Sequence, residues 1–583
     1  MNILGINAFH GDSSACLLVD GKLVMAIEEE RFKRIKHWAG FPIDAIQACL
    51  SEADLKITDI DHIAISRDPK ANFNLKILHG LKSLKNPKYL LQRLANRKKV
   101  QSIEQHFISA FELKKNLKAQ IHNVEHHISH LASAFLASPF EEAALLSVDG
   151  FGDFSSTLLG YGKGSQISVY EKVTFPHSIG VFYTALTQYL GFPNYGDEYK
   201  VMGLAPYGKP EMVIELKKIL INTLDGLFKI EEKYFKHSTQ GVQMSWNNCY
   251  PEISQIFSSQ MEKLLGPARK KQDELTQYHK DIAASVQKVC EETIFHVLNH
   301  LHAKIKTQTG KDLPLCMAGG VAQNSVANGK IYLNTAFKNS YIPPAATDAG
   351  TCIGAALYVH NVILGNPRVT PMLSGNLGSK FSEQYILQML EAKKVPFKKL
   401  NDSEIIHICV ESLCEGGVVG WFHDRSEFGP RALGFRSILA DPRRADAKDI
   451  LNEKIKRRES FRPFAPSVLI EFVDEFFEQN DQVPFMEKVF VIRPEKRSLI
   501  PAVTHIDGTG RLQSVDKKAN ERYYNLIHHF YLKTGVPMLL NTSFNENEPI
   551  VNSPNEALDC FLRTKMDMLV LGNILVKRAG IDI

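Results

Sequence analysis

Long apolar runs and closely spaced pairs of cysteines are missing from this sequence, and its first residues do not have the pattern of a leader segment. No run of about 18 apolar residues occurs, which excludes a transmembrane helix. The nine cysteines are scattered without a CxxC pair, as expected for reduced core thiols. Residues 1–7 have the pattern of a strand and lack the basic segment of a signal peptide. We therefore expect a cytoplasmic protein with no membrane segment.

Strong net charge and a Walker loop are also missing. A net charge of +5 on 583 residues is too small to indicate nucleic-acid binding. The pattern GxxxxGK[ST] does not occur, so any phosphates must be held by side chains and irregular turns. The 44% hydrophobic and 23% charged content is that of a soluble globular protein. The length exceeds a single hydrophobic core, and we expect two or three domains.

A histidine-rich stretch, residues 126–130, opens a predicted helix. Residues four apart lie on one face of a helix, so His126 and His130 can present two imidazoles to the same point. His127 is three residues from His130 and competes for the same role. An HxxxH pair alone is a weak signal for a metal, because most histidines are surface or core residues.

Two acidic residues strengthen the metal prediction. Asp149 ends a predicted buried strand, residues 143–148, and precedes a glycine turn, where open α/β sheets bind ligands. Asp348 follows a Pro-Pro loop and precedes a helix of small residues. We predict that both carboxylates join His126 and His130 around one divalent transition metal. The mixture of imidazole and carboxylate favours iron, and zinc or manganese would also fit.

One pattern of strands occurs twice in the first half of the chain. Strand, polar glycine turn, strand, hairpin and strand follow one another in residues 2–27 and again in residues 143–173. The second turn contains Gly150 and Gly152. This repetition predicts a duplicated α/β domain with a phosphate-binding turn in each half. It is similar to the ribonuclease H-like fold of actin, sugar kinases and chaperone ATPases.

A second glycine-rich turn follows a long predicted helix, residues 274–306. The strand after this helix ends in Gly319-Gly320, and glycine lets backbone approach a nucleotide closely. Gln323 and Asn324 are the nearest polar side chains. Close packing of a helix on a strand would explain the turn equally well if it stood alone.

The character of the chain changes near residues 365–378, which are rich in Pro, Gly and Ser. We predict domains at 1–365 and 366–583. In the second domain several arginines are framed by Gly and Pro, which suits forked recognition of phosphate or carboxylate. Asn541 and Ser543, two apart after an apolar strand, add amide and hydroxyl contacts. These clusters predict an anion site.

Together the motifs resemble the NodU/CmcH-type O-carbamoyltransferases. They occur in family order at residues 26–32, 36–37, 126–134, 149–153, 200–208, 317–324, 427–434, 461–467 and 541–545. The resemblance implies an N-terminal domain similar to the tRNA threonylcarbamoyl-transfer ATPase and a YrdC-like C-terminal domain. The C-terminal domain would make carbamoyl-adenylate from carbamoyl phosphate and ATP with Mg²⁺. The N-terminal domain would use its metal to pass the carbamoyl group to a hydroxyl.

The resemblance also implies residue roles. His10, Asp12 and Lys36 would be catalytic, with His10 as acid or base toward the acceptor. In many members histidine and aspartate are adjacent in this turn, whereas here Gly11 separates them. The nucleotide and carbamoyl phosphate would be bound by Gly150, Gly152, Lys200, Gly319, Gly320, Asn324, Arg431, Lys456, Arg462, Arg511, Asn541 and Ser543.

Three other functions compete with the carbamoyltransferase. A fused tRNA threonylcarbamoylation enzyme would use the basic residues 84–118 against phosphates. A sugar-kinase-like phosphotransferase would share the first domain's fold and release ADP. A non-catalytic ATP-dependent scaffold would have no use for the arginine-rich second half. We favour the carbamoyltransferase, with a small-molecule hydroxyl acceptor such as a natural product, no nucleic-acid partner and room for a homodimer.

Overall fold

The computed structural model describes residues 1–82, 103–113, 117–238, 240, 242, 244–247, 249–369, 371–459 and 461–578. The chain divides into two compact units, one of residues 1–327 and 331–372, the other of residues 328–330 and 373–583. Most of the basic stretch 84–118 lies outside the described residues. No helix in the described ranges is long and apolar enough to cross a membrane.

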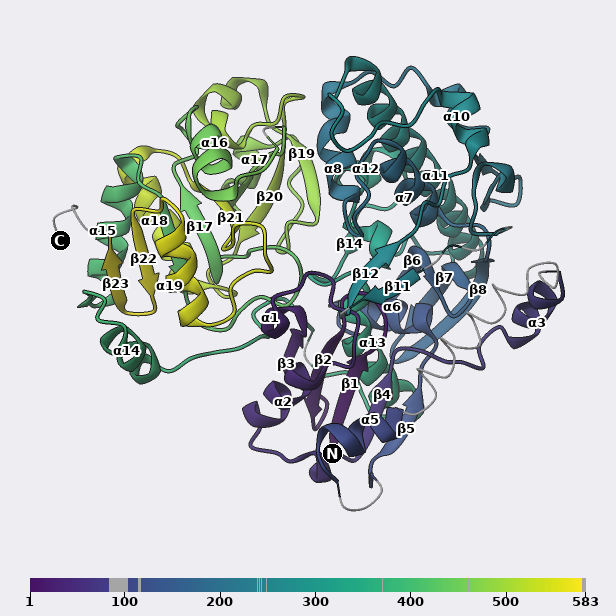
Figure 1. Ribbon diagram of the computed structural model, residues 1–583, viewed down its shortest axis with the longest axis horizontal. Helices are drawn as coiled ribbons and strands as arrows, with labels where there is room; N and C mark the ends of the chain where they lie inside the picture. Colours follow the sequence, from purple (N-terminus) through teal and green to yellow (C-terminus); the bar gives the residue numbers. More distant parts are fainter. Residues whose placement is uncertain are drawn as a thin grey trace. The chain divides into compact units, whose positions relative to one another are not determined.

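Unit 1 contains two sheets of identical topology (Figure 1). In each, three antiparallel strands are extended by two parallel ones, in the order 3-2-1-4-5. The first sheet has β1 (Asn2–Asn7), β2 (Ser14–Val19), β3 (Lys22–Glu28), β4 (His62–Ile65) and β5 (Gln120–Asn123). The second has β6 (Glu142–Gly152), β7 (Ser155–Lys163), β8 (Gln166–Thr174), β13 (Leu315–Ala318) and β14 (Ser340–Tyr341). The predicted duplicated ribonuclease H-like domain is confirmed.

Two helices lie between these sheets. Helix α6 (His126–Phe135) packs on β6 and β13, and α13 (Thr351–Leu357) packs on β1, β2 and α6 (Figure 1). A Cβ on Gly354 of α13 would lie 1.8 Å from the carbonyl oxygen of Ser129 in α6. One on Gly5 in β1 would lie 2.2 Å from the carbonyl oxygen of Cys352. Glycine at both positions therefore lets α13 sit close to α6 and to the first sheet.

Further elements cover the sheets of unit 1. The long helix predicted at 274–306 is α11 (Gln277–Thr309), and it contacts α7 (Ile179–Tyr189), α8 (Glu198–Leu204) and β6. The remaining elements include α2 (Ile43–Glu52), α3 (Phe73–Lys82), α5 (Ile103–Ala110), α10 (Ser259–Leu265) and α12 (Ser325–Asn334). The irregular region 217–255 contains two short hairpins, β9 (Leu220–Asn222) with β10 (Phe228–Ile230) and β11 (Met244–Asn247) with β12 (Tyr250–Ile253).

Unit 2 is built on a nine-stranded mixed sheet. Its order is β15 (Lys398–Lys399), β23 (Ile574–Lys577), β22 (Met568–Leu571), β16 (Val419–Phe422), β17 (Arg436–Ala440), β21 (Met538–Ser543), β18 (Ala465–Leu469), β20 (Thr509–Val515) and β19 (Lys488–Val491). Helices α14 (Glu383–Ala392), α15 (Asp402–Cys414), α16 (Ala447–Ile450), α17 (Val473–Phe476), α18 (Glu521–Thr534) and α19 (Pro554–Arg563) accompany it. Helix α18 packs on β18 and β21, and α19 packs on β16 and β22. The predicted α/β class of this unit is confirmed, and its likeness to YrdC stays a prediction.

The division between the units falls after Met372, seven positions beyond the predicted boundary at 365/366. Residues 366–372 are held by unit 1. The Arg368 guanidinium donates to the carbonyl oxygens of Phe135 and Phe140, at 2.9 and 2.6 Å. The Met372 amide donates to Ala137 at 2.8 Å. These backbone contacts, which the Pro- and Gly-rich composition did not reveal, keep the segment on the first unit.

Candidate functional site

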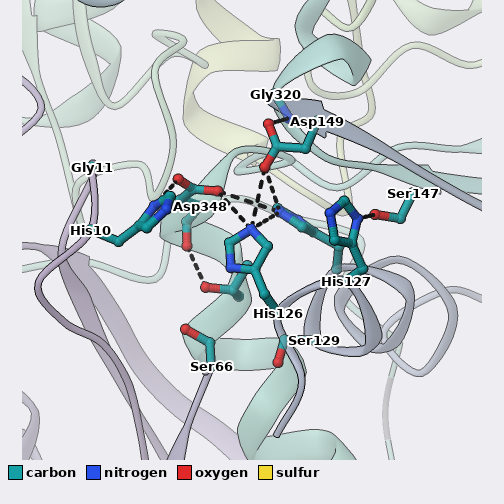
Figure 2. Close-up of polar contacts among 12 residues, drawn as sticks. His10, Gly11, Ser66, His126, His127, Ser129, Ser147, Asp149, Gly320 and Asp348 are labelled. Atoms are coloured by element: carbon teal, nitrogen blue, oxygen red, sulfur yellow. Dashed lines mark hydrogen bonds and ion pairs between the residues drawn. The ribbon is translucent and has the colours of Figure 1, made fainter. Parts of the chain in front are cut away.

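Helix α6 begins directly at the histidine pair. The Glu125 carboxylate caps the helix by accepting the backbone N–H of Ile128 at 2.7 Å. The Asp153 carboxylate accepts the backbone N–H of His126 at 3.0 Å. Both acids satisfy amides that the first turn of a helix leaves without partners. The first turn is thereby fixed, and His126 and His130 point from one helical face toward β6 (Figure 2).

Four side chains converge at this point, as Figure 2 shows. The Nε2 atoms of His126 and His130 are 3.1 Å apart. Asp149 Oδ2 lies 3.3 and 3.2 Å from these two nitrogens. Asp348 Oδ1 lies 3.3 and 3.4 Å from them. All four residues are buried, and their nearest atoms lie within 4.8 Å of one another.

The carboxylate of Asp149 is oriented by the glycine turn predicted to bind a nucleotide. The backbone N–H of Gly320 donates to Asp149 Oδ1 at 3.0 Å, which leaves Oδ2 for the histidines. A Cβ on Gly320 would lie 2.7 Å from that same oxygen. Gly152 has a comparable role, since a Cβ there would lie 1.9 Å from Cδ2 of the His126 ring. Both glycines thus make room for the convergence of the four side chains.

Electrostatics make the four groups strongly interdependent. Burial opposes protonation of His126 and His130, but Asp149 and Asp348 outweigh it and raise the pKa of both imidazoles. Burial and the adjacent Asp348 oppose ionisation of Asp149, yet the two histidines hold its pKa below the ordinary value. Burial likewise opposes ionisation of Asp348, and His10 followed by His126 and His130 lowers its pKa. Positive charge at the centre is therefore strongly favoured.

His127 does not join the group, although it shares the first turn of α6. Its Nδ1 lies 2.6 Å from Ser147 Oγ on strand β6 (Figure 2). Burial, together with the charges of His126 and His130, lowers the pKa of His127 to about 3. It is therefore a neutral core histidine, and the geometry brings His126 rather than His127 to the other three side chains.

The arrangement fits a divalent metal ion. Bonds of 2.0–2.1 Å in a tetrahedral site place two ligand nitrogens about 3.3 Å apart, close to the observed spacing of the two Nε2 atoms. Asp348 Oδ1 is buried and makes no hydrogen bond of ordinary geometry with any described residue, although both Nε2 atoms are near. Two carboxylates and two neutral imidazoles suit iron, manganese or zinc.

His10 lies at the edge of this group. Its Nδ1 is 2.5 Å from Asp348 Oδ2, and its ring centroid is 5.2 Å from that of His126. The side chain keeps 26% of its exposure. The turn between β1 and β2 therefore delivers a partly accessible imidazole to the buried centre (Figure 2).

Asp12 pairs with a histidine that we did not predict. His37 Nδ1 lies 2.7 Å from Asp12 Oδ1, and both residues have left-handed backbone, at φ 57° and 58°. Burial opposes protonation of His37, but Asp12 outweighs it and raises the pKa of His37 to about 9. The predicted catalytic Lys36 is exposed beside it. A Cβ on Gly11 would lie 2.4 Å from Tyr195 Oη, so the glycine between His10 and Asp12 admits this phenol.

Three of the other four residues predicted to bind nucleotide in unit 1 have structural partners. Gly319 has φ +104°, and a Cβ there would lie 2.1 Å from the carbonyl oxygen of Val148. Asn324 caps α12 by accepting the backbone N–H of Ala327 at 3.1 Å. Lys200 forms an ion pair with Asp197 at 3.0 Å. Gly150 has open space around it, since a Cβ would meet nothing within 4 Å. Nucleotide binding by these four residues stays a prediction.

In unit 2 the predicted arginines gather around Arg511. Burial, followed by the charges of Arg431, Arg458 and Arg462, lowers the pKa of Arg511 well below its ordinary value. Burial and Arg462 lower the pKa of Arg431 to about 10. Within the described part of the chain, Arg431 and Arg511 form no ion pair with an acid, whereas Arg462 lies 3.6 Å from Glu459. A partly buried group of like charges suits an anion.

Three residues predicted to contact an anion form hydrogen bonds with other residues of unit 2. Lys456 Nζ donates to the carbonyl and side-chain oxygens of Asn545 at 2.9 and 2.7 Å, and contacts Ser543. Asn541 Nδ2 donates to Ser467 Oγ at 2.9 Å and to the Ala432 carbonyl oxygen at 3.1 Å. These contacts fix the loops around the arginines. Direct contact of the three residues with a ligand stays a prediction.

Sequence reasoning left out Arg458, which stands in the same arginine-rich run as Lys456 and Arg462. Its guanidinium stacks over the Phe464 ring at 4.5 Å, and its Nε donates to Asn452 Oδ1 at 2.8 Å. His37 was likewise passed over in favour of Lys36. His37 pairs with an acid 25 positions away in the sequence. No local pattern in the sequence shows such a pairing.

The chain matches two family models. The model of the carbamoyltransferase N-terminus matches residues 2–357, and that of the carbamoyltransferase C-terminus matches residues 410–578. The chain therefore belongs to the carbamoyltransferase family, and the predicted enzyme class is confirmed.

Several relatives are similar to this chain over most of its length. The nodulation protein NolNO of Sinorhizobium fredii is 39% identical over 98% of this chain and 80% of its own length. NolO of Bradyrhizobium diazoefficiens is 41% identical over 78% of this chain and 79% of its own. An uncharacterized Synechocystis protein, sll1178, is 39% identical over 99% and 97%. The crystal structure of T. kodakarensis HypF covers 61% of this chain and 47% of its own at 13% identity, with a TM-score of 0.32. That score is too low to support a conclusion.

Proposed function

We propose that this carbamoyltransferase works in two steps. Unit 2 makes carbamoyl-adenylate from carbamoyl phosphate, water and ATP, with release of phosphate and pyrophosphate. Unit 1 then passes the carbamoyl group to a hydroxyl of a small-molecule acceptor, with release of AMP. The observation that carries the proposal is the contrast between two sites, a buried centre of two histidines and two acids in unit 1 and a group of arginines in unit 2. The first suits a cation and the second suits phosphates.

The arginine group supports the activation step. Arg431, Arg462 and Arg511 would neutralise the charge of carbamoyl phosphate and of the ATP phosphates as they approach each other. Like-charged guanidinium groups held together in a partly buried place cost free energy, which a bound polyanion would recover. The lowered pKa of Arg431 and Arg511 is the sign of that cost.

The buried centre supports the transfer step. His126, His130, Asp149 and Asp348 would hold a divalent metal, which we expect to be iron. Such an ion supplies Lewis acidity toward a carbonyl or phosphoryl oxygen. His10 is oriented by Asp348 through Nδ1, and its Nε2 makes no hydrogen bond with a described residue. We assign to His10 Nε2 the role of base that accepts the proton of the acceptor hydroxyl. The hydroxyl oxygen then bonds to the carbamoyl carbon while AMP leaves.

The proposal is tested by following both half-reactions in one preparation. Pyrophosphate release from ATP with carbamoyl phosphate reports activation, and mass spectrometry of hydroxylated metabolites reports transfer. We expect His130→Ala to retain pyrophosphate release and lose carbamoylated product, and Arg511→Ala to lose pyrophosphate release. Loss of both steps in His130→Ala, with neither lost in Arg511→Ala, would contradict the assignment of the two units.

A further inference from the structure

Arg431 stands in a loop that joins β16 to β17 and has little freedom. The loop contains Gly429 and Gly434, both with left-handed backbone at φ 115° and 91°. A Cβ on Gly434 would lie 2.2 Å from the Tyr523 ring, so the loop is also pressed against helix α18. Such a loop keeps its shape only when its backbone groups have fixed partners.

A single buried carboxylate binds the amides of this loop. Glu427 is fully buried, and its Oε1 accepts the backbone N–H groups of Leu433, Phe435 and Arg436 at 2.7, 3.0 and 3.0 Å. Its Oε2 is also buried and has no hydrogen-bond partner among the described residues. Hydrogen bonds to an ionised acceptor are about twice as strong as neutral ones. The charge of Glu427 therefore favours this one loop conformation.

Side-chain donors form hydrogen bonds with the backbone carbonyl groups of the same loop. The carbonyl oxygens of residues 432, 433 and 434 accept N–H groups from Asn541, Gln513 and Trp421, each at 3.1 Å. These donors lie on strands β21, β20 and β16. The backbone that follows Arg431 is therefore tied on both its amide and its carbonyl side, while the Arg431 guanidinium itself has no acidic partner in the described part of the chain.

We infer that Glu427 is a positioning residue for anion binding: its carboxylate holds the loop in the conformation that presents Arg431 beside Arg462 and Arg511. The inference rests on the proposed function, because it takes the arginine group to be the phosphate site. A purely structural carboxylate would stabilise unit 2 without being coupled to Arg431. The two roles differ in whether the effect of Glu427 on anion affinity depends on the presence of Arg431.

A double-mutant cycle on the full chain separates these roles. Titration with inorganic pyrophosphate gives the dissociation constant of the wild type, Glu427→Gln, Arg431→Ala and the double variant. Glutamine keeps the shape and one oxygen but removes the charge. We expect each single substitution to weaken binding about tenfold, as for loss of one charge-assisted contact. The double variant should bind no more weakly than Arg431→Ala alone.

The alternatives give different results. Equal affinity in the wild type and Glu427→Gln, or losses that multiply in the double variant, would overturn the positioning role. Unchanged binding in Arg431→Ala would remove the arginine site itself, and with it the proposed function of unit 2. Should Glu427→Gln fail to fold, Gln513→Ala, which frees the carbonyl oxygen of Leu433, takes its place in the same cycle with a smaller loss expected.

Glu29 offers a matched control in unit 1. It is fully buried like Glu427 and accepts the backbone N–H groups of Asp44 and Ala45 at 3.2 and 2.8 Å. Burial raises the pKa of Glu29 to about 7, so the control is measured at a pH above that value, where Glu29→Gln removes a buried charge that has no connection to an arginine site. We expect it to lower the melting temperature and leave the dissociation constant of pyrophosphate unchanged. A loss of pyrophosphate affinity in Glu29→Gln equal to that in Glu427→Gln would overturn the inference, because general destabilisation would then explain both.

Discussion

The buried centre of unit 1 and the arginine group of unit 2 solve opposite electrostatic problems. In unit 1 each histidine faces two carboxylates, and the pKa of the acids is lowered while that of both imidazoles is raised. In unit 2 burial, followed by the charges of neighbouring arginines, lowers the pKa of Arg431 and Arg511. The first site already balances its charge and can exchange protons for a metal, whereas the second is balanced only by an anion.

The largest effect is expected from removing a histidine of the centre. His130→Ala leaves three of the four donors, and we expect metal binding and acceptor carbamoylation to fall more than about a hundredfold, since even second-sphere changes cost ten- to a hundredfold. Elemental analysis should find about one metal equivalent in the wild type and none in the variant. His127→Gln, which alters the neighbouring core histidine, should keep its metal. Equal metal content in all three proteins would contradict the site.

A smaller effect is expected from the arginine group. Arg511→Ala removes one charge-assisted contact of about 1.5–3 kcal/mol, and we expect pyrophosphate release to slow by roughly ten- to a hundredfold. Metal content should not change. The half-buried Arg444, which pairs with Asp446, is the control, and Arg444→Ala should release pyrophosphate at the normal rate. An equal loss in both variants would show that the effect comes from the overall charge of the chain and not from the arginine group.

The comparison is sharpened by the glycines around the centre. In Gly152→Ala the new Cβ would collide with the His126 ring, 1.9 Å away, and displace it from Asp149. We expect about a tenfold loss of metal affinity, as for a second-sphere change. Gly150→Ala meets no atom within 4 Å and should retain its metal. Chelator competition measures both, and a metal affinity in Gly152→Ala equal to that of the wild type would show that the His126 ring is not confined there.

The last prediction concerns folding stability alone, at the pair of Asp12 and His37 in unit 1. With a pKa of about 9 in the folded chain against an ordinary 6.5, protonated His37 stabilises the fold fully below pH 6.5. This contribution, up to about 3 kcal/mol, declines as the pH rises through 9. Urea unfolding of the wild type and His37→Gln should therefore show a difference in unfolding free energy that is largest near about pH 6 and small near about pH 9.5. A difference that grows with pH would mean that His37 is neutral when paired with Asp12.

Much of the first unit could be predicted from local patterns. Strand and turn signals depend on neighbours in the chain, so the repeated strands of residues 2–27 and 143–173 predicted two sheets of one topology. The spacing of His126 and His130 depends only on helical periodicity. These features are visible because their partners are close in sequence. Asp149 was predicted to follow a strand of residues 143–148, whereas β6 continues to Gly152 with irregular pairing after Val148.

Only the tertiary structure decided which polar groups are available to a ligand. Gly319 and Gly320 do approach something closely, but the nearest atoms are the Val148 carbonyl oxygen and the Asp149 carboxylate of β6. Asn324 and Asn541 are occupied by a helix cap and by the loop of Arg431. A polar side chain is available to a ligand only when no protein group satisfies it first, and those partners come from distant segments.

The chemistry of both sites follows from residue type, whereas their geometry follows from the fold. Residue type was enough to propose histidine, aspartate and arginine for metal and phosphate, because charge and donor chemistry belong to the side chain itself. The choice of His126 over His127 and the pairing of Asp12 with His37 depend on which atoms folding brings within about 3 Å. The effect of the Arg458 charge on Arg511 likewise depends on the fold. The sequence therefore determined the chemistry that this protein can offer, and only the packing of α6, α13 and the sheets decided where that chemistry is used.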